Sequence, residues 1–340
     1  MDKEYYRIKN IPENFLLLRF VATRFCNFRC PYCYLSDEKR AKEKNMFTFH
    51  SPDEWAAAVE RLSDRTLELY FTGGEPLLLD GLADFLAKAV EMKHVSCVRI
   101  DSNLSPLKRF LKKVDSPKIR FLASFHPTHV PFDKFMEKLE LLKGKGMLGM
   151  VNVVASKENI KILDKGPNEL IAEFDARGMF LNVAKDFERG LKLGYNKKYK
   201  DFIDKLQHPQ DNAYMNKIPS NEGVLCGSGK HYISVNRHGN LYSCPEDACH
   251  GNLFGQFDLP GGLCYCSRPI CPSIISYSFS QSNCFSPSDH LSGYVKRNIE
   301  HRRIVSREYL EKVWCVLKEE DFHLRRRMPI LATLKAMLHK

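Results

Sequence analysis

The sequence has no hydrophobic run long enough to cross a membrane, and no N-terminal stretch with the pattern of a secretory signal peptide. The run FLLLRFVA at residues 15–22 is short and is interrupted by Arg19, which is typical of a strand. Twelve cysteines in a chain without a secretion signal indicate metal or redox sites in a reducing compartment, not a disulfide framework. We therefore expect a cytoplasmic protein.

The sequence also has fewer acidic than basic residues. It contains 41 Asp and Glu and 52 Lys and Arg, which gives a net charge of +11. A basic protein favours an anionic small-molecule substrate, and we expect no nucleic-acid partner. The basic excess is concentrated in residues 296–340. Residues 322–340 fit an amphipathic helix that either contacts a membrane surface or an acidic partner, or packs on its own domain. We favour packing, since helices of ordinary domains show the same pattern.

Apolar strand-like segments alternate with helical patterns over the first 190 residues. The predicted strands are 15–22, 67–72, 97–102, 119–125, 148–155 and 179–184. One helix is predicted to start after an N-cap at Ser51, with Pro52 in the first turn and Glu54 three residues on, and another covers 132–143. Six successive βα units predict an α/β fold with a parallel sheet, which right-handed crossovers would curl into an open barrel.

Three cysteines, Cys26, Cys30 and Cys33, follow the first predicted strand in the run RFCNFRCPYCYL. Three thiolates in eight residues can bind three corners of a cubane iron–sulfur cluster and leave the fourth iron open for a substrate or cofactor. Zinc is the alternative, but it needs a fourth ligand nearby. The next candidates are His50 and Cys97, so the spacing favours the cluster.

A second motif follows the second predicted strand, where residues 67–76 read LELYFTGGEP. Gly73 and Gly74 would let the backbone approach a ligand closely, and the carboxylate of Glu75 suits an ammonium group. Alone, Gly-Gly-Glu-Pro is also an ordinary turn. Its place 40 residues after the cysteine motif makes a ligand-binding turn the stronger interpretation.

Together, CNFRCPYC and GGEP resemble the radical S-adenosylmethionine (radical SAM) superfamily. The resemblance implies a partial (β/α)6, TIM-like barrel over residues 1–190. It also implies a [4Fe–4S] cluster on the three cysteines, whose open iron binds S-adenosylmethionine. Reductive cleavage of that cofactor would give a 5′-deoxyadenosyl radical. The cofactor-binding residues that the resemblance implies are Tyr32, Gly73, Gly74, Glu75, Pro76, Ser124 and Asn152.

Active residues of parallel barrels come from the carboxyl ends of the strands. Residues 101–103 close the third predicted strand, His126 closes the fourth, and Lys185 and Asp186 follow the sixth. We predict substrate roles for His126, Lys185 and Asp186. Surface or helix-capping roles are the alternative for these residues.

Seven further cysteines fall between residues 226 and 284. Cys226 and Cys244 bound a C-x12-G-x4-C segment, in which YISV and NLYS flank a turn at Gly239 and predict a hairpin. This segment resembles the SPASM and twitch extensions of radical SAM enzymes, which bind auxiliary four-iron clusters. The remaining spacing departs from the SPASM pattern, because Cys264-x-Cys266-x4-Cys271 is followed by Cys284 twelve residues on.

We therefore predict one auxiliary cluster in a SPASM- or twitch-like domain at 223–290. Cys226 and Cys244 would be two ligands, and two of Cys264, Cys266 and Cys271 would complete the set. Four thiolates suit zinc equally well, so zinc stays open as the alternative. Residues 191–222 are predicted to connect the two domains, and 291–340 to form a basic helical segment.

The leading hypothesis is a radical SAM enzyme that abstracts hydrogen from a small substrate, with the auxiliary cluster aiding oxidation, bond formation or epimerisation. A reducing partner such as flavodoxin or ferredoxin would supply the electron. Only 25 residues precede Cys26, too few for the winged-helix peptide-binding domain of many relatives, which disfavours a peptide-modifying maturase. An iron–sulfur electron carrier without catalytic activity is the hypothesis from another class, and it leaves the GGEP turn unexplained.

Overall fold

The computed structural model describes residues 11–33, 35, 45–163, 167–179, 181–186, 222–244, 249–268, 271 and 279. Nearly all of the predicted connecting segment at 191–222 lies outside these described residues. Cys284 and the basic segment at 291–340 lie outside them as well.

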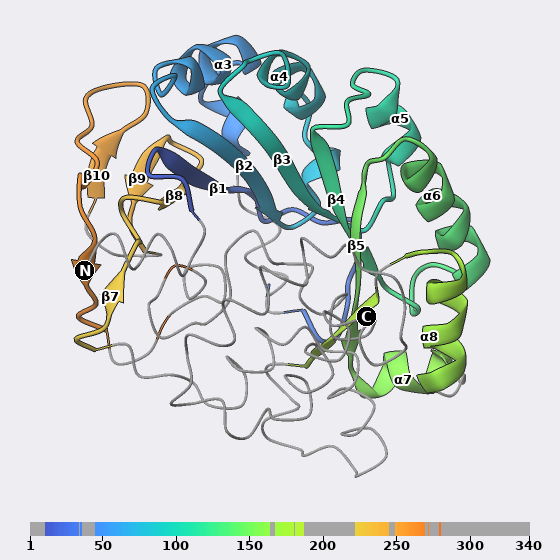
Figure 1. Cartoon of the computed structure of the whole chain (residues 1–340). Helices are drawn as coiled ribbons and strands as arrows, with labels where there is room; N and C mark the ends of the chain where they lie inside the picture. The colour runs from blue at the N-terminus through green and yellow to red at the C-terminus, as the bar shows by residue number, and fades with distance from the viewer. Residues whose placement is uncertain are drawn as a thin grey trace, which may run out of the picture.

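Six strands form the frame of the fold, and each is parallel to the next. They are β1 (Phe15–Thr23), β2 (Thr66–Gly73), β3 (Val95–Ser102), β4 (Ile119–Phe125), β5 (Leu148–Ala155) and β6 (Leu181–Lys185). All six lie within two residues of the predicted segments. The α/β class is therefore confirmed, and Figure 1 shows the strands as a curved sheet with the helices on its outer side.

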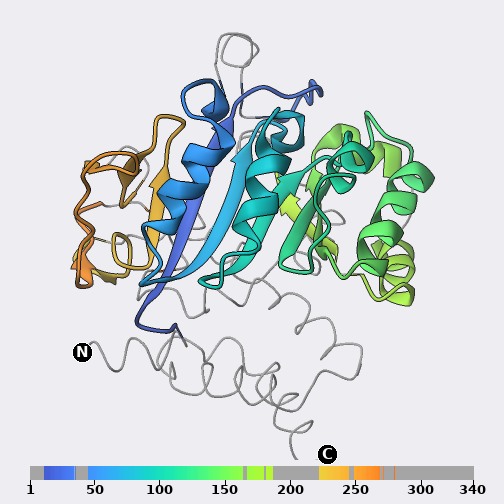
Figure 2. The same cartoon turned by 90° about the horizontal axis from the view of Figure 1, so that it is seen from above.

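The helices that follow these strands are α3 (Pro52–Glu60), α4 (Leu82–Ala89), α5 (Leu107–Leu111), α6 (Phe132–Gly144), α7 (Lys157–Leu163) and α8 (Pro167–Ala176). Two 3-10 turns, η1 (Met46–Thr48) and η2 (Pro76–Leu78), accompany them. The predicted start of α3 is confirmed, because Ser51 Oγ accepts the Glu54 N–H at 3.2 Å and Glu54 Oε2 accepts the Ser51 N–H at 2.7 Å. Figure 2 shows α3 and α4 lying across one face of the sheet.

Alternation along the strands gives the sheet two different faces. On β1, Leu16, Leu18 and Phe20 are fully buried against the helices, where Phe20 packs edge-on to Trp55 with ring centroids 5.8 Å apart. The opposite, inner face has a smaller apolar cluster that includes Tyr70. Between its apolar members the inner face carries polar and charged side chains, so it is the face equipped to meet a polar ligand.

The cysteine-rich region continues the same sheet at its β1 edge. β8 (Tyr232–Val235) pairs in parallel with β1. Antiparallel β9 (Asn240–Tyr242) and β10 (Cys249–Asn252) then extend the order to β10-β9-β8-β1-β2-β3-β4-β5-β6. The predicted hairpin is confirmed, with Gly239 at a φ of +82° in its turn. β7 (Leu225–Cys226) and β11 (Cys264–Tyr265) form a separate two-stranded ladder.

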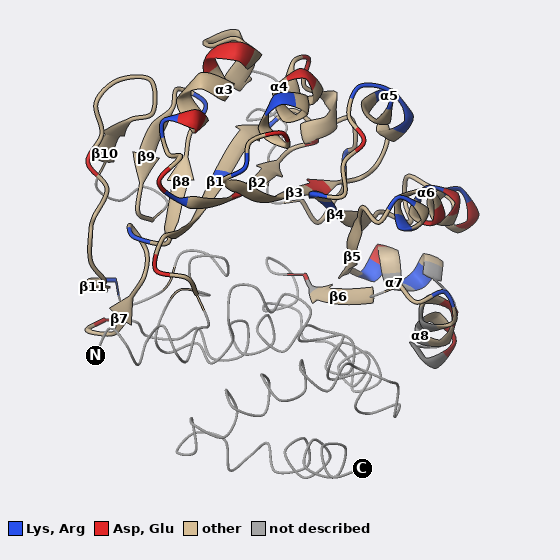
Figure 3. Ribbon diagram, turned by 45° about the horizontal axis from the view of Figure 1, so that its top comes forward, with Lys and Arg blue, Asp and Glu red and all other residues tan. Residues whose placement is uncertain are grey.

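The outer helices carry mixed charge, as Figure 3 shows. Lys88 on α4 pairs with Asp53 on α3 at 2.6 Å, and Lys113 after α5 pairs with Asp84 on α4 at 2.8 Å. These pairs are well exposed, so each contributes little to stability. No helix in the described part of the chain is both long and apolar enough to span a bilayer.

Candidate active site

The three clustered cysteines lie on the loop that leaves the carboxyl end of β1, where parallel α/β folds place their active residues. The Cys33 N–H donates to the carbonyl of Cys30 at 3.1 Å and closes a tight turn. The backbone N–H of Phe28 points at Cys26 Sγ (3.4 Å), and that of Leu35 points at Cys33 Sγ (3.5 Å). We call residues 24–33 the cluster loop.

The GGEP turn packs directly on the cluster loop. The Gly74 N–H donates to the Thr23 carbonyl at 2.7 Å, and the Glu75 N–H donates to the Phe25 carbonyl at 2.8 Å. Gly73 has a φ of +129°, and a Cβ on Gly74 would stand 2.0 Å from the Phe25 oxygen. Both glycines are therefore required for the two loops to meet.

Glu75 lies beneath this contact with 1% of its surface exposed. Its Oε1 accepts from Ser102 Oγ (2.8 Å) and the Leu77 N–H (3.1 Å), and its Oε2 accepts from the Asn103 N–H (2.7 Å). The carboxylate thereby ties the GGEP turn to the end of β3. Burial raises the pKa of Glu75 to about 7 despite these three donors, so a cationic group beside it would favour the ionised form.

The loop after β3 also touches the cluster loop. Asn103 Nδ2 donates to Asn27 Oδ1 at 3.0 Å and lies 3.8 Å from Cys26 Sγ. Asn27 Nδ2 in turn donates to Ser105 Oγ at 3.0 Å. Its strand-end position places residue 103 among the candidates from the sequence, but no role was assigned to it there.

Two histidines after β4 contact the cluster loop from the other side. His126 Nδ1 lies 2.8 Å from Tyr32 Oη and 3.3 Å from Cys30 Sγ, while His129 Nε2 accepts the Arg29 N–H at 3.0 Å. Burial lowers the pKa of His126 to about 4, and His129 adds a smaller effect, so the His126 ring is neutral at pH 7. Burial raises the pKa of Tyr32 well above its usual range.

Ser124 and Asn152, which the resemblance assigned to the cofactor, are register partners on β4 and β5. Asn182 on β6 extends the row, because it pairs with Asn152 and its Nδ2 donates to Asn152 Oδ1 at 2.8 Å. No role for Asn182 was predicted from the sequence. Lys185 ends β6, and the following Asp186 is buried with 4% of its surface exposed.

A hydrogen-bonded group on β2 and β3 lies on the same inner face. Tyr70 Oη donates to Asp101 Oδ2 at 2.5 Å and Thr72 Oγ1 donates to the same oxygen at 2.8 Å. Burial raises the pKa of Asp101 above its usual value. Two residues before Asp101 on β3, Arg99 forms an ion pair with Glu68 on β2. These residues make the inner face polar beside the predicted cofactor site.

The second cysteine group gathers around Cys226. The β7–β11 ladder sets Cys226 opposite Cys264. Burial raises the pKa of Cys226, and nearby Cys244, Cys264 and Cys271 raise it further by their charge. Cys266 Sγ instead lies 3.8 Å from the Arg268 carbonyl. Of the three candidates left open by the spacing, the structure thus brings Cys264 and Cys271 to Cys226.

Both cysteine groups suit iron–sulfur chemistry. Within the described ranges, no three side chains from Cys, His, Asp or Glu are arranged to hold a single metal ion. A four-iron cluster binds each thiolate at a separate iron, so its ligands surround a volume and do not meet at one point. Thiolates are also the ligands that soft iron–sulfur centres prefer.

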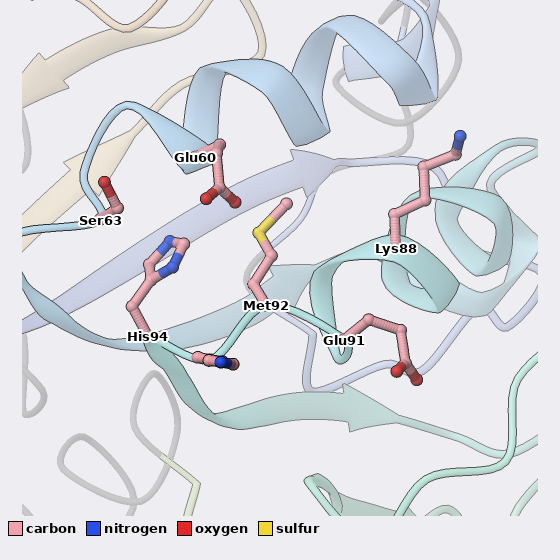
Figure 4. A pocket seen from close by; sticks show the side chains of 7 residues that line it. Glu60, Ser63, Lys88, Glu91, Met92 and His94 are labelled. Atoms are coloured by element: carbon pink, nitrogen blue, oxygen red, sulfur yellow. The ribbon is translucent and has the colours of Figure 1, made fainter.

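A surface hollow of about 510 Å³ lies elsewhere, lined by Glu60, Ser63, Lys88, Glu91, Met92, Lys93 and His94 (Figure 4). These residues lie at the last turns of α3 and α4 or follow them, before β2 and β3 begin, so the hollow lies at the amino end of the strands. Ligands of parallel α/β folds bind at the opposite, carboxyl edge. The hollow is therefore separate from the site built around the cluster loop.

Comparison with known proteins agrees with this geometry. Residues 20–161 match the family model described as the Radical SAM superfamily. The chain is 23% identical to the radical SAM cyclopropyl synthase TigE of Paramaledivibacter caminithermalis, across 93% of this chain and 75% of TigE. It is also 23% identical to the GTP 3′,8-cyclase of Helicobacter pylori, across 73% of this chain and 79% of that enzyme.

Among solved structures, SuiB of Streptococcus suis bound to S-adenosylmethionine superposes with a TM-score of 0.50 at 15% identity. That alignment covers 74% of this chain and 66% of SuiB, and it supports the fold. The family match spans β1 to α7 and so contains both the cluster loop and the GGEP turn. Residues 20–161 of this chain are therefore a radical SAM domain, and enzymes of that superfamily use a [4Fe–4S] cluster and S-adenosylmethionine.

Proposed function

We propose that this enzyme binds a [4Fe–4S] cluster on Cys26, Cys30 and Cys33 and reductively cleaves S-adenosylmethionine. Cluster and cofactor together would supply a 5′-deoxyadenosyl radical that abstracts hydrogen from a substrate C–H bond. The observation that carries the proposal is the pair of backbone hydrogen bonds from Gly74 to Thr23, at the end of β1, and from Glu75 to Phe25 of the cluster loop. That contact sets a cluster site and a turn suited to an amino-acid cofactor side by side.

The protein groups around this site have distinct tasks in the proposal. Glu75 would hold the cofactor ammonium, because its two oxygens accept three hydrogen bonds and a carboxylate offers about four acceptor positions. Ser124 and Asn152 would hydrogen-bond the polar groups of the cofactor from β4 and β5. Tyr32, half-buried beside Cys33, would pack against the cofactor.

The substrate would bind on the inner face, where Asp101, Tyr70 and Thr72 form a polar group next to Glu68 and Arg99. This lining favours a polar small molecule, and the likeness to GTP 3′,8-cyclase supports an anionic one. Lys185 and Asp186, at the end of β6, are the proposed substrate contacts on the far side. The alternative is that the substrate is a peptide, and a screen of candidate substrates would show this.

The electron would come from a reduced carrier such as a flavodoxin or ferredoxin. Basic side chains follow the loop that contacts Asn27, namely Lys108, Lys112 and Arg109, of which Arg109 is ion-paired with Asp80 (Figure 3). This charge suits an acidic carrier. The thiolate ligands need a reducing compartment, so we place the enzyme in the cytoplasm.

The proposed function is tested with anaerobically reconstituted protein, S-adenosylmethionine and dithionite. We expect 5′-deoxyadenosine and methionine in equal amounts, measured by liquid chromatography and mass spectrometry. Protein that holds its full iron and sulfide but releases no 5′-deoxyadenosine would instead favour the electron-carrier hypothesis. Omitting dithionite is the control, because the cleavage requires an electron.

We further propose that Cys226, Cys244, Cys264 and Cys271 bind one auxiliary cluster. A Cys271→Ser variant should lose between about one and about four iron atoms per chain, because the iron at one corner loses its thiolate and the remaining core is less stable. The matched Cys266→Ser variant should keep its iron, since Cys244, Cys264 and Cys271 are the thiols whose charge raises the pKa of Cys226. Iron and sulfide analysis of both variants decides the ligand set. If Cys266→Ser loses iron and Cys271→Ser does not, Cys266 is the ligand and Cys271 is not. If the parent protein binds zinc and no iron at this site, the auxiliary cluster does not exist.

A further inference from the structure

His126 is placed where it can act on the cluster through a cysteine. It follows β4, and its Nδ1 lies 3.3 Å from Cys30 Sγ. The ring is held on two sides, because Phe28 packs edge-on against it with centroids 5.6 Å apart and Tyr32 stacks on it at 6.0 Å. The imidazole therefore presents one defined nitrogen to the sulfur of a proposed cluster ligand.

We propose that His126 donates an Nδ1–H···Sγ hydrogen bond to the Cys30 thiolate and thereby raises the reduction potential of the radical SAM cluster. This makes His126 a positioning residue that acts through Cys30, and not the substrate contact that its strand-end position suggested. The inference rests on the proposed function, since it requires a cluster at Cys30.

The competing partner of Nδ1 is the Tyr32 hydroxyl, at 2.8 Å. The Tyr32 hydroxyl also lies near the side chains of Asn159, Cys30 and Thr128, so Nδ1 is not its only neighbour. A thiolate bound to iron can only accept, so Nδ1 must carry the proton for a bond to Cys30 to form. If Nδ1 instead accepts from Tyr32, His126 merely orients that ring and the potential does not depend on it.

The direction of the effect follows from charge. Reduction adds one negative charge to the cluster, and part of it falls on the thiolate sulfurs. An N–H donor stabilises the reduced state more than the oxidised state, and hydrogen bonds to sulfur are among the factors that set cluster potentials. The bond would ease the one-electron reduction that starts catalysis.

His129 offers a matched control from the same loop. Its Nε2 accepts the backbone N–H of Arg29 and its Nδ1 lies 2.8 Å from Thr128 Oγ1, so both ring nitrogens face partners other than sulfur. Phe28 packs on His129 as well, with centroids 4.5 Å apart. Changing His129 removes a histidine that holds the cluster loop but leaves the contact to Cys30.

The test is a redox titration, followed by electron paramagnetic resonance, of reconstituted full-length protein at one fixed pH. The signal that shifts on adding S-adenosylmethionine identifies the relevant cluster. We expect His126→Leu to lower the reduced-to-oxidised ratio about tenfold at a given potential, a shift of about 59 mV for one electron. In His126→Asn the amide N–H replaces Nδ1–H, so this variant should recover most of the lost reduction potential. His129→Leu should have the same reduction potential as the parent.

An unchanged potential in His126→Leu would overturn the inference while leaving the proposed function intact. If His126→Leu loads no cluster, parent protein labelled with ¹⁵N-histidine still decides the question. A hyperfine coupling from one histidine nitrogen to the reduced cluster, absent in His126→Asn, is expected, and its absence in the parent would contradict the hydrogen bond. A parent without a cluster that responds to S-adenosylmethionine would remove the proposed function and the inference together.

Discussion

Replacing Cys30 by alanine should lower the rate of 5′-deoxyadenosine formation at least about 1,000-fold. This corresponds to an increase of more than about 4 kcal/mol in the activation free energy. Cys30 is the middle ligand of the proposed set and is buried against His126. Without it, Cys26 and Cys33 can bind only two corners of the cluster. The measurements are iron content and 5′-deoxyadenosine release under dithionite, with any auxiliary cluster still accounting for about four irons.

Cys97→Ala is the matched control for this experiment. Cys97 lies on β3, where burial raises the pKa of its thiol to about 11, so it is a protonated thiol at pH 7. Removing it should leave the iron content and the cleavage rate within about twofold of the parent. A Cys30→Ala protein that still cleaves S-adenosylmethionine would show that the cluster is bound elsewhere.

The strands and the cluster loop could be predicted because local signals determine them. The short apolar run at residues 15–22 marks β1 without reference to the rest of the chain, and the capping box at Ser51 marks a helix start. The cysteine spacing and GGEP are likewise contained in short segments. The hairpin around Gly239 follows from its flanking strands and turn.

The unpredicted parts depend on contacts between residues far apart in sequence. The register of β8 against β1 joins residues more than 200 positions apart, and no local pattern indicates that edge. The hydrogen bonds of Asn103 to Asn27 and of His129 to Arg29 depend on how two loops meet above the sheet. The proposal of Cys271 in place of Cys266 rests on its nearness to Cys226, which the cysteine spacing alone left open.

The second large effect is expected from Gly74→Ala. A Cβ at this position would lie 2.0 Å from the Phe25 oxygen, 2.5 Å from the Phe25 carbonyl carbon and 2.8 Å from the Arg24 carbonyl carbon. All three are backbone atoms, so no side chain can rotate away, and the GGEP turn must move off the cluster loop. Displacements near 1 Å at a reacting site can cost about 100-fold. We expect S-adenosylmethionine affinity to fall by at least that factor.

Anaerobic calorimetry with S-adenosylmethionine measures this loss, and Gly144→Ala supplies the control. An added Cβ at Gly144, the last residue of α6, meets no atom within 4 Å, so affinity should not change. The same methyl group is thus placed once in open space and once between two loops. Because Gly74 contacts the backbone of the cluster loop, Gly74→Ala should also slow iron loading. Parent-like affinity in Gly74→Ala would mean that the cofactor does not depend on this contact, and Glu75 would lose its assignment to the cofactor ammonium.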